Sequence, residues 1–181
     1  MKLGLTLLRT IVGALFFGHG TQKLFGWFGG HGIEGTAGFF EGIGLRPGRK
    51  HATAAGAAEA GGGALLALGF LTPAAAASLI GVMSTAIRKV HAKNGPWVTD
   101  GGYEYNLALI AIMVTLADVG PGDLSLDHAL GIEVKGPLVA LLALAAGIGG
   151  AVVLTGGGSQ ATEPVVPPTD TPQPAEAAAT V

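Results

Sequence analysis

The chain contains no cysteine, and this absence removes several kinds of redox and metal chemistry. Disulfide exchange, thiol catalysis, iron–sulfur clusters and cysteine-ligated zinc all need cysteine side chains, so none of them can form within this chain. A redox role would therefore require a bound organic cofactor, a haem or a partner protein. The formal net charge over 181 residues is only −2, which gives no indication of a nucleic-acid partner.

Charge of either sign is scarce. Charged residues make up 12% of the sequence, whereas a soluble globular domain carries about 25%. The mean hydropathy is +0.55, and the apolar residues gather in long uncharged runs. Many of the 32 glycines lie inside these runs, where small residues allow helices to approach closely in lipid. The composition predicts an all-α, polytopic transmembrane helix bundle that crosses the lipid bilayer several times.

Five apolar segments have the lengths expected of membrane spans, which need about 20 mainly apolar residues. The first four belong to one predicted domain, residues 1–131, and the fifth follows within residues 132–154. The predicted spans are residues 3–25, 53–71, 73–90, 103–119 and Pro137–Leu154. Between the first two, Thr36–Ile43 is expected to form a short amphipathic helix. Residues 155–181 are rich in Pro, Thr and Ala and are predicted to be a disordered tail.

The end of the first span, within Phe16–Phe28, carries an unusual set of polar residues. His19, Gln22 and Lys23 are three and four residues apart, so they share one face of a helix. Span order brings this face to the same side of the bundle as the start of the second span. Glu59 lies about six residues into that span, roughly 9 Å deep, and His19 lies at a similar depth. Glu59 is therefore the predicted counter-charge of the face that carries His19 and Lys23.

Three further residues are expected at the rim of this polar pocket, because the third span ends and the fourth begins on the same side. They are Arg88, His91 and Glu104. The basic loop residues also gather on this side, and an excess of Lys and Arg marks the cytoplasmic face of membrane proteins. This pattern favours a cytoplasmic location for the pocket side and an external amino terminus.

Arg9 interrupts the first span near the opposite side of the bundle. It belongs to a stripe with Gly13 and Gly20, and this stripe is expected to face other helices because it carries every full charge of the segment. Asp118 or Asp127, on the same side, is the predicted partner of Arg9 in a structural ion pair.

Seven features follow one another along the chain: Arg9, FFGHGTQKLFGWFGG, GTAGFFEGIGL, AEAGGGALLALGF, AIRKVH, GGYEYNLALIAIMV and GPGDLSLD. This ordered set resembles the DoxX family of small bacterial integral membrane proteins. The resemblance runs from about Leu5 to Asp127 and implies a core of four helices in the bacterial inner membrane. The family is named for a subunit type linked to thiosulfate:quinone oxidoreductase, and some members are associated with redox or oxidative-stress systems. It supplies no catalytic residue to transfer.

The polar pocket has two interpretations. A quinone head group needs hydrogen-bond donors for its carbonyls and a proton route, within an apolar slot. His19 and Lys23 would donate, Glu59 would relay protons, and Phe16 and Phe25 would line the slot. Alternatively, the same residues form an ion-pair and hydrogen-bond network that only fixes the helices. The sequence leaves both open, and quinone is the candidate cofactor.

The sequence pattern fits a haem or a metal site less well than it fits a quinone. A haem would need two histidines at similar depth on facing helices, but His91 lies at a span end and His19 within a span, so no metal site is predicted. The predicted function is a membrane component of a redox or quinone-linked system that acts with a soluble or membrane partner. The alternative is a non-catalytic scaffold or a small transporter. Whether the chain is an oxidoreductase subunit, and whether it forms a homo-oligomer, stays open.

Overall fold

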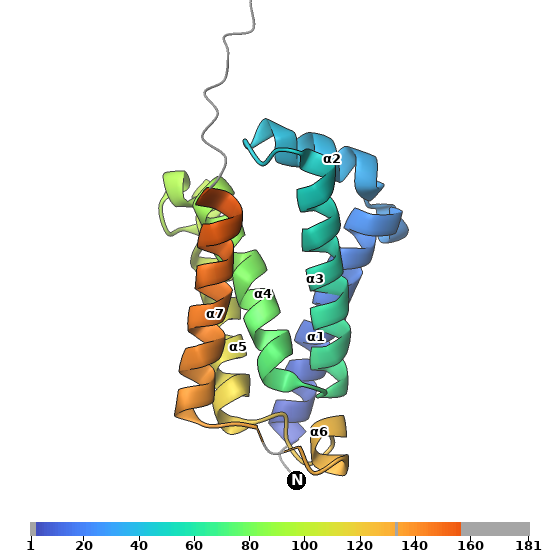
Figure 1. Cartoon of the computed structure of the whole chain (residues 1–181), viewed down its shortest axis with the longest axis vertical. Helices are drawn as coiled ribbons and strands as arrows, with labels where there is room; N and C mark the ends of the chain where they lie inside the picture. The colour runs from blue at the N-terminus through green and yellow to red at the C-terminus, as the bar shows by residue number, and fades with distance from the viewer. Residues whose placement is uncertain (1–2, 133, 157–181) are drawn as a thin grey trace, which may run out of the picture.

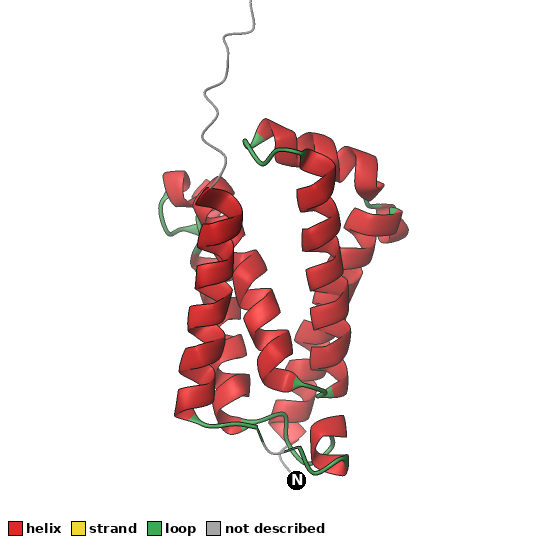
Figure 2. Ribbon diagram, in the orientation of Figure 1, coloured by secondary structure: helices red, strands yellow, loops and turns green. Residues whose placement is uncertain are grey.

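The described part of the chain is all-helical. The computed structural model describes residues 3–132 and 134–156, and these contain helices and loops but no strand (Figure 2). Most of the predicted disordered tail, residues 155–181, lies outside the described residues. Its first two residues, Thr155 and Gly156, belong to the last helix, so that helix extends beyond its predicted end at Leu154.

Five long helices of the described residues form the bundle, and short elements connect them. The long helices are α1 (Leu3–Phe25), α3 (Gly48–Leu68), α4 (Thr72–Ala86), α5 (Glu104–Val119) and α7 (Pro137–Gly156). The connecting elements are η1 (Trp27–Gly29), α2 (Gly32–Gly42), η2 (Ile87–His91), η3 (Ala92–Asn94), η4 (Val98–Asp100) and α6 (Leu126–Ala129). Successive long helices run in opposite directions (Figure 1), so α2 lies at one end of the bundle and α6 at the other. These are called the α2 end and the α6 end.

The observed helix bounds differ from the predicted spans where charged residues flank an apolar run. Helix α3 begins at Gly48 rather than at residue 53, because the basic residues that precede the apolar run still form helical hydrogen bonds. The predicted third span, residues 73–90, is α4 followed by the π-helical turn η2. The short amphipathic helix expected at Thr36–Ile43 is α2, which begins at Gly32. Hydropathy thus locates the apolar part of each helix better than its ends.

Helices α1 and α3 pack with their backbones almost in contact. A Cβ atom built on Gly13 would lie 2.5 Å from the amide nitrogen of Ala67, and one built on Gly20 would overlap the backbone of Ala60. Small residues allow this approach. The predicted inward stripe of α1 is confirmed at Arg9, Gly13 and Gly20, which are all buried.

The bundle consists of two packed groups. In one, α1 and α2 pack on α3; in the other, α4 packs on α5 and α7; α3 joins the groups through α4. The shared core is fully buried at mid-bundle, at Leu79 and Ile80, and toward the α6 end, at Leu66, Leu116 and Ala117. The approach of α7 to α4 again uses glycine, because a Cβ atom on Gly147 would meet the side chain of Ile80 at 2.6 Å.

Asp127 of α6 caps the start of α4. Its Oδ1 accepts a hydrogen bond from the amide of Leu71 (2.7 Å), and its Oδ2 accepts from the amide and the hydroxyl of Thr72 (3.0 and 2.7 Å). The first amides of a helix lack intrahelical acceptors, and α4 has no capping side chain of its own. A carboxylate distant in the sequence therefore fixes the turn between α3 and α4.

Arg9 is not joined to a carboxylate by any ion pair within residues 3–132 and 134–156. Its guanidinium donates to the carbonyl oxygens of Ala67, Pro121 and Leu124, which lie at the ends of α3 and α5 and in the following loop. The predicted pairing with Asp118 or Asp127 is therefore not a contact ion pair, although Asp127 is near enough to stabilise the charge of Arg9 electrostatically. Asp118 is exposed, and the oxygens of Asp127 are committed to α4. The reason is that carbonyl oxygens left free where helices end satisfy a cation as well as a carboxylate does.

Two helices of the described residues, α1 and α7, are long and apolar enough to cross a membrane. Helices α4 and α5 have 15 and 16 residues, fewer than the ~20 of a perpendicular span. Length and composition therefore support two of the five predicted spans.

We expect Gly20→Leu to destabilise the protein by about 3 kcal/mol or more, because the new side chain would separate α1 from α3. The measurement is thermal unfolding of the purified protein in detergent, followed by circular dichroism. Gly18→Leu is the matched control: a Cβ atom there meets nothing within 4 Å, so its effect should stay within about 1 kcal/mol. Equal effects of the two substitutions would contradict the close contact of α1 and α3.

We expect Asp127→Asn to cost about 1–3 kcal/mol, because the amide group would turn an N–H toward the N–H and O–H donors at the start of α4. The exposed Asp118 provides the control, since Asp118→Asn should change stability by no more than about 0.5 kcal/mol. The same unfolding measurement applies. A neutral Asp127→Asn would show that the cap does not hold the turn between α3 and α4.

Candidate functional site

An ion pair between Lys23 of α1 and Glu59 of α3 lies near the α2 end of the bundle. The Nζ of Lys23 lies 2.5 Å from Oε2 of Glu59. The glutamate side chain is 4% exposed and the lysine side chain 27% exposed, so the carboxylate is the more deeply buried partner. The pair can form because Gly20, one turn before Lys23, brings α1 against Gly56 and Ala60, on either side of Glu59.

This pair leaves hydrogen-bonding capacity unused. Lys23 Nζ has three donors, and its one hydrogen bond among the described residues goes to Glu59 Oε2. Glu59 Oε1 makes no hydrogen bond within residues 3–132 and 134–156. Since every buried side-chain nitrogen or oxygen in this part of the chain has a partner, Oε1 is not fully covered by protein atoms and borders open space. One carboxylate oxygen is therefore available to another molecule.

The open space is a cavity of about 590 Å³, here called the inner cavity, between the two packed groups of helices. All five long helices and α2 contribute to its lining, which is mostly apolar and includes Phe16, Phe40 and Leu109. Its volume falls in the range of ~300–1,000 Å³ typical of ligand sites. The lining residues with titratable groups or a side-chain amide are His19, Lys23, His51, Glu59, His91, Tyr105 and Asn106. An apolar chamber with few polar groups suits an amphipathic organic ligand.

A second cavity, of about 530 Å³, lies on the other side of His19 and Lys23 and is here called the outer cavity. Its lining includes Gln22, His31 and Thr36 and belongs to α1, η1, α2 and the connections between them. His19, Lys23 and Phe39 line both cavities. These three side chains therefore border both an apolar cavity and a more polar one, and they are here called the partition.

His19 and Gln22 are held by local hydrogen bonds. His19 Nδ1 lies 3.1 Å from Gln22 Oε1, and Gln22 Nε2 donates to the carbonyl of Phe28 (3.3 Å). Because Nδ1 is taken by the glutamine, Nε2 is the histidine nitrogen left for other contacts. Gln22 lines the outer cavity alone, so it positions His19 rather than facing the inner cavity.

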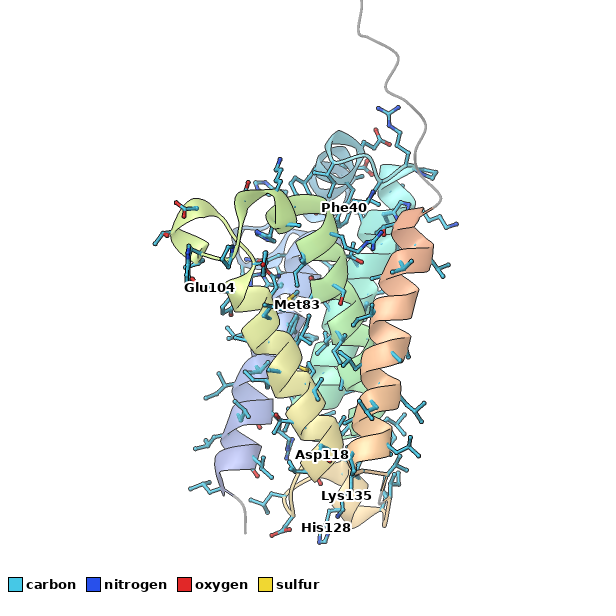
Figure 3. The ribbon with its side chains drawn as sticks, turned by 90° about the vertical axis from the view of Figure 1, so that its left-hand side faces the viewer. Phe40, Met83, Glu104, Asp118, His128 and Lys135 are labelled. Atoms are coloured by element: carbon cyan, nitrogen blue, oxygen red, sulfur yellow. The ribbon has the colours of Figure 1, made fainter. Side chains whose placement is uncertain are left out.

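The three residues predicted at the rim of the polar pocket do not lie together. His91 lines the inner cavity, and its Nδ1 lies 2.7 Å from the carbonyl of Gly101. Arg88 and Glu104 do not line it: Arg88 Nε donates to Thr155 Oγ1 (3.1 Å), and Glu104 accepts from the amide of Val98 (2.7 Å). Figure 3 shows Glu104 on the outer side of the bundle. The expectation of one rim that contains all three residues is therefore wrong, because helix order fixes the end of the bundle but not the direction of each side chain.

The sequence analysis missed several polar lining residues, among them His51 and Asn106. His51 precedes Glu59 by two steps of four on α3, a spacing that places both on similar faces of a helix and could have indicated it. Asn106 is buried on α5, and its amide lies 3.4 Å from the sulfur of Met83. No sequence signal distinguishes Asn106 from an ordinary polar residue near a helix start.

Residues 4–92 match the family model DoxX. The chain belongs to the DoxX family through this region, and it is a membrane protein of the DoxX kind. The match covers α1 to α4 and ends just after η2, so α5, α6 and α7 lie outside it, although the motifs resembling the family continue to Asp127. No curated protein and no solved structure matches the chain.

We expect Lys23→Met to destabilise the protein by about 3–5 kcal/mol, because it leaves the buried carboxylate of Glu59 without a counter-charge. Glu59→Gln should cost less, since the remaining Lys23 is more exposed. The double variant Lys23→Met/Glu59→Gln should be more stable than Lys23→Met alone. Unfolding in detergent measures all three free energies.

A matched control for this cycle is the exposed ion pair between Arg49 and Glu34, whose side chains are 65% and 76% exposed. Arg49→Met should change stability by no more than about 1 kcal/mol. The burial argument would be wrong if Lys23→Met and Arg49→Met had the same effect.

Proposed function

We propose that this protein is a multi-pass component of a quinone-linked redox system in the bacterial inner membrane, in which the inner cavity holds a quinone head group. The observation that carries the proposal is the Lys23–Glu59 ion pair, which presents an unused acceptor and unused donors to an apolar cavity. A quinone, when bound, supplies reversible transfer of electrons and protons. The residues of this chain hold and orient its ring and exchange its protons.

In the proposed arrangement all five long helices cross the bilayer and α2 lies at its surface. Large apolar side chains exposed along the outsides of the helices support this arrangement, among them Leu7, Ile11, Leu141 and Val153. The exposed aromatic cluster of Phe25, Trp27 and Phe28 lies at the α2 end; aromatic residues are enriched at membrane interfaces. Helices as short as α5 are accommodated by local thinning of the bilayer.

The inner cavity has the hydrogen-bonding groups that a quinone ring requires. Lys23 Nζ is a donor for a carbonyl oxygen. Glu59 Oε1 accepts from a hydroxyl of the reduced ring, and so does His19 Nε2, because the proton of the neutral imidazole is on Nδ1, which donates to Gln22 Oε1. Phe16, Phe40 and the small residues of α3 and α4 exclude water around the ring. The cavity thus combines a polar corner with an apolar chamber, as quinone binding needs.

The partition between the cavities supplies a proton connection. Glu59 faces the inner cavity, whereas His19 and Lys23 face both cavities. In the proposed route, a proton from the outer cavity passes to Glu59 through Lys23, whose Nζ is hydrogen-bonded to Glu59 Oε2. Rotation of His19 is restrained by Gln22, which keeps the imidazole in the partition.

Electron exchange in this proposal involves a partner protein, since the chain lacks cysteine and so cannot hold a cluster or dithiol of its own. The basic residues at the α2 end would attract an acidic partner. They include Arg46, Arg49, Lys50, Lys89 and Lys93, and their excess supports a cytoplasmic location for this end. The same basic surface favours the second candidate function, a membrane scaffold without bound ligand. A transporter is disfavoured because the fully buried core fills the bundle toward the α6 end.

We expect quinone to copurify with the wild-type protein from native membranes and to be lost in Glu59→Gln and His19→Ala. Mass spectrometry of lipid extracts, normalised to protein, measures the retained quinone. His128→Ala is the control, because His128 lies at the α6 end (Figure 3), far from the cavity, and should leave quinone content unchanged. Equal quinone in all four proteins, with retained capture of a partner, would favour the scaffold function instead.

A further inference from the structure

The inner cavity opens between α3 and α7. These two helices lie on either side of α4 (Figure 1) and pack against α4 rather than extensively against each other. Residues that line the cavity on this side are nevertheless exposed on the surface of the bundle, namely Ala54 of α3 and Ala146, Gly150 and Leu154 of α7. A residue that is both lining and exposed marks the place where a cavity meets its surroundings. This opening, here called the portal, faces lipid in the proposed membrane arrangement.

Small side chains keep the portal wide. Ala54 and Ala58 stand on the α3 side, and Ala146 and Gly150 on the α7 side. A Cβ atom built on Gly150 would meet nothing within 4 Å, so the glycine is not required for helix contact. The position of α7 is fixed elsewhere, by the contact of Gly147 with Ile80 of α4. The space beside Gly150 is therefore not produced by a loosely held helix.

The α7 wall of the cavity is its least polar side. The corner formed by His19, Lys23 and Glu59 lies on α1 and α3, whereas the α7 wall is apolar until Thr155 near its end, whose hydroxyl is occupied by Arg88. On the side between α1 and α5, the exposed lining residues are the larger Leu15, His19 and Tyr105. An amphipathic molecule with its ring at Glu59 would thus place its apolar end toward the portal.

We propose that the portal between α3 and α7 takes the aliphatic chain of a lipid-soluble quinone, and that Gly150 determines whether that chain fits. This inference rests on the proposed function and narrows it to quinones with long chains, bound with the ring inside and the chain extending into lipid. It assigns α7, which lies outside the family match, a part in ligand selection.

The test compares two probes on purified protein in lipid nanodiscs: decylubiquinone and the same ring without its chain. Gly150→Leu fills the portal, so it should weaken decylubiquinone binding by about tenfold or more, a loss of ~1.4 kcal/mol. Binding of the chainless ring should change by less than about twofold. Ala54→Leu, on the facing side of the portal, should act in the same way. Titration of intrinsic tryptophan fluorescence with each probe gives the dissociation constants.

Gly149→Leu is the matched control, because Gly149 is the neighbouring residue, has equally open space at its Cβ position and does not line the cavity. It should leave the binding of both probes unchanged. The portal is wrong if Gly150→Leu and Ala54→Leu leave decylubiquinone binding intact, or if they weaken both probes equally. Failure of the wild-type protein to bind either probe would overturn the proposed function itself, which separates the two failures.

Discussion

Backbone contact between α1 and α3 is the constraint from which the candidate site follows. Gly13 and Gly20 allow the two helices to touch where any larger side chain would separate them. A short lysine-to-carboxylate distance can then be held at depth, where a pair formed across a wider gap would be weaker and partly hydrated. The same contact commits α3 to the group that contains α1 and α2, so that α3 reaches α5 and α7 mainly through α4. The cavity and the portal both lie in the space that this arrangement leaves open.

The sequence predicted some parts of this site and not others. Inferences from the order of the spans succeeded, whereas inferences about the direction of single side chains did not. The order of the spans along the chain determines the depth of each residue in the bundle. This order was enough to predict that Glu59 lies beside Lys23. Side-chain direction depends on local geometry: the π-helical turn η2 alters the rotation of the helix where Arg88 lies, and Arg88 contacts α7 instead of the cavity. Arg9 shows a further limit, since carbonyl oxygens at helix ends carry no sequence signature. An arginine in an apolar run therefore does not identify its partner.

The two ends of the bundle use charge differently. At the α6 end, the guanidinium of Arg9 and the carboxylate of Asp127 each bind backbone groups where helices end, and the surrounding core is fully buried. The charged groups of Arg9 and Asp127 therefore stabilise the turns at this end of the bundle. At the α2 end, the charges of Lys23 and Glu59 satisfy each other only in part and border two cavities. Polar groups that bind backbone atoms and polar groups that line cavities are thereby separated along the bundle axis.

A buried ion pair is by itself weak support for either stability or function, because the desolvation of two charges offsets much of their attraction. What distinguishes Lys23 and Glu59 is the incomplete use of their hydrogen-bonding groups. A pair that serves only to fix helices gains by burying every donor and acceptor against protein atoms, as Asp127 does with both of its oxygens. Glu59 instead engages Oε2 alone and leaves Oε1 toward an apolar chamber, where the absence of a partner is costly in a low-dielectric surrounding. In the proposed function a molecule with a hydroxyl group would offset that cost, and this unequal use of the two carboxylate oxygens is what separates Glu59 from Asp127.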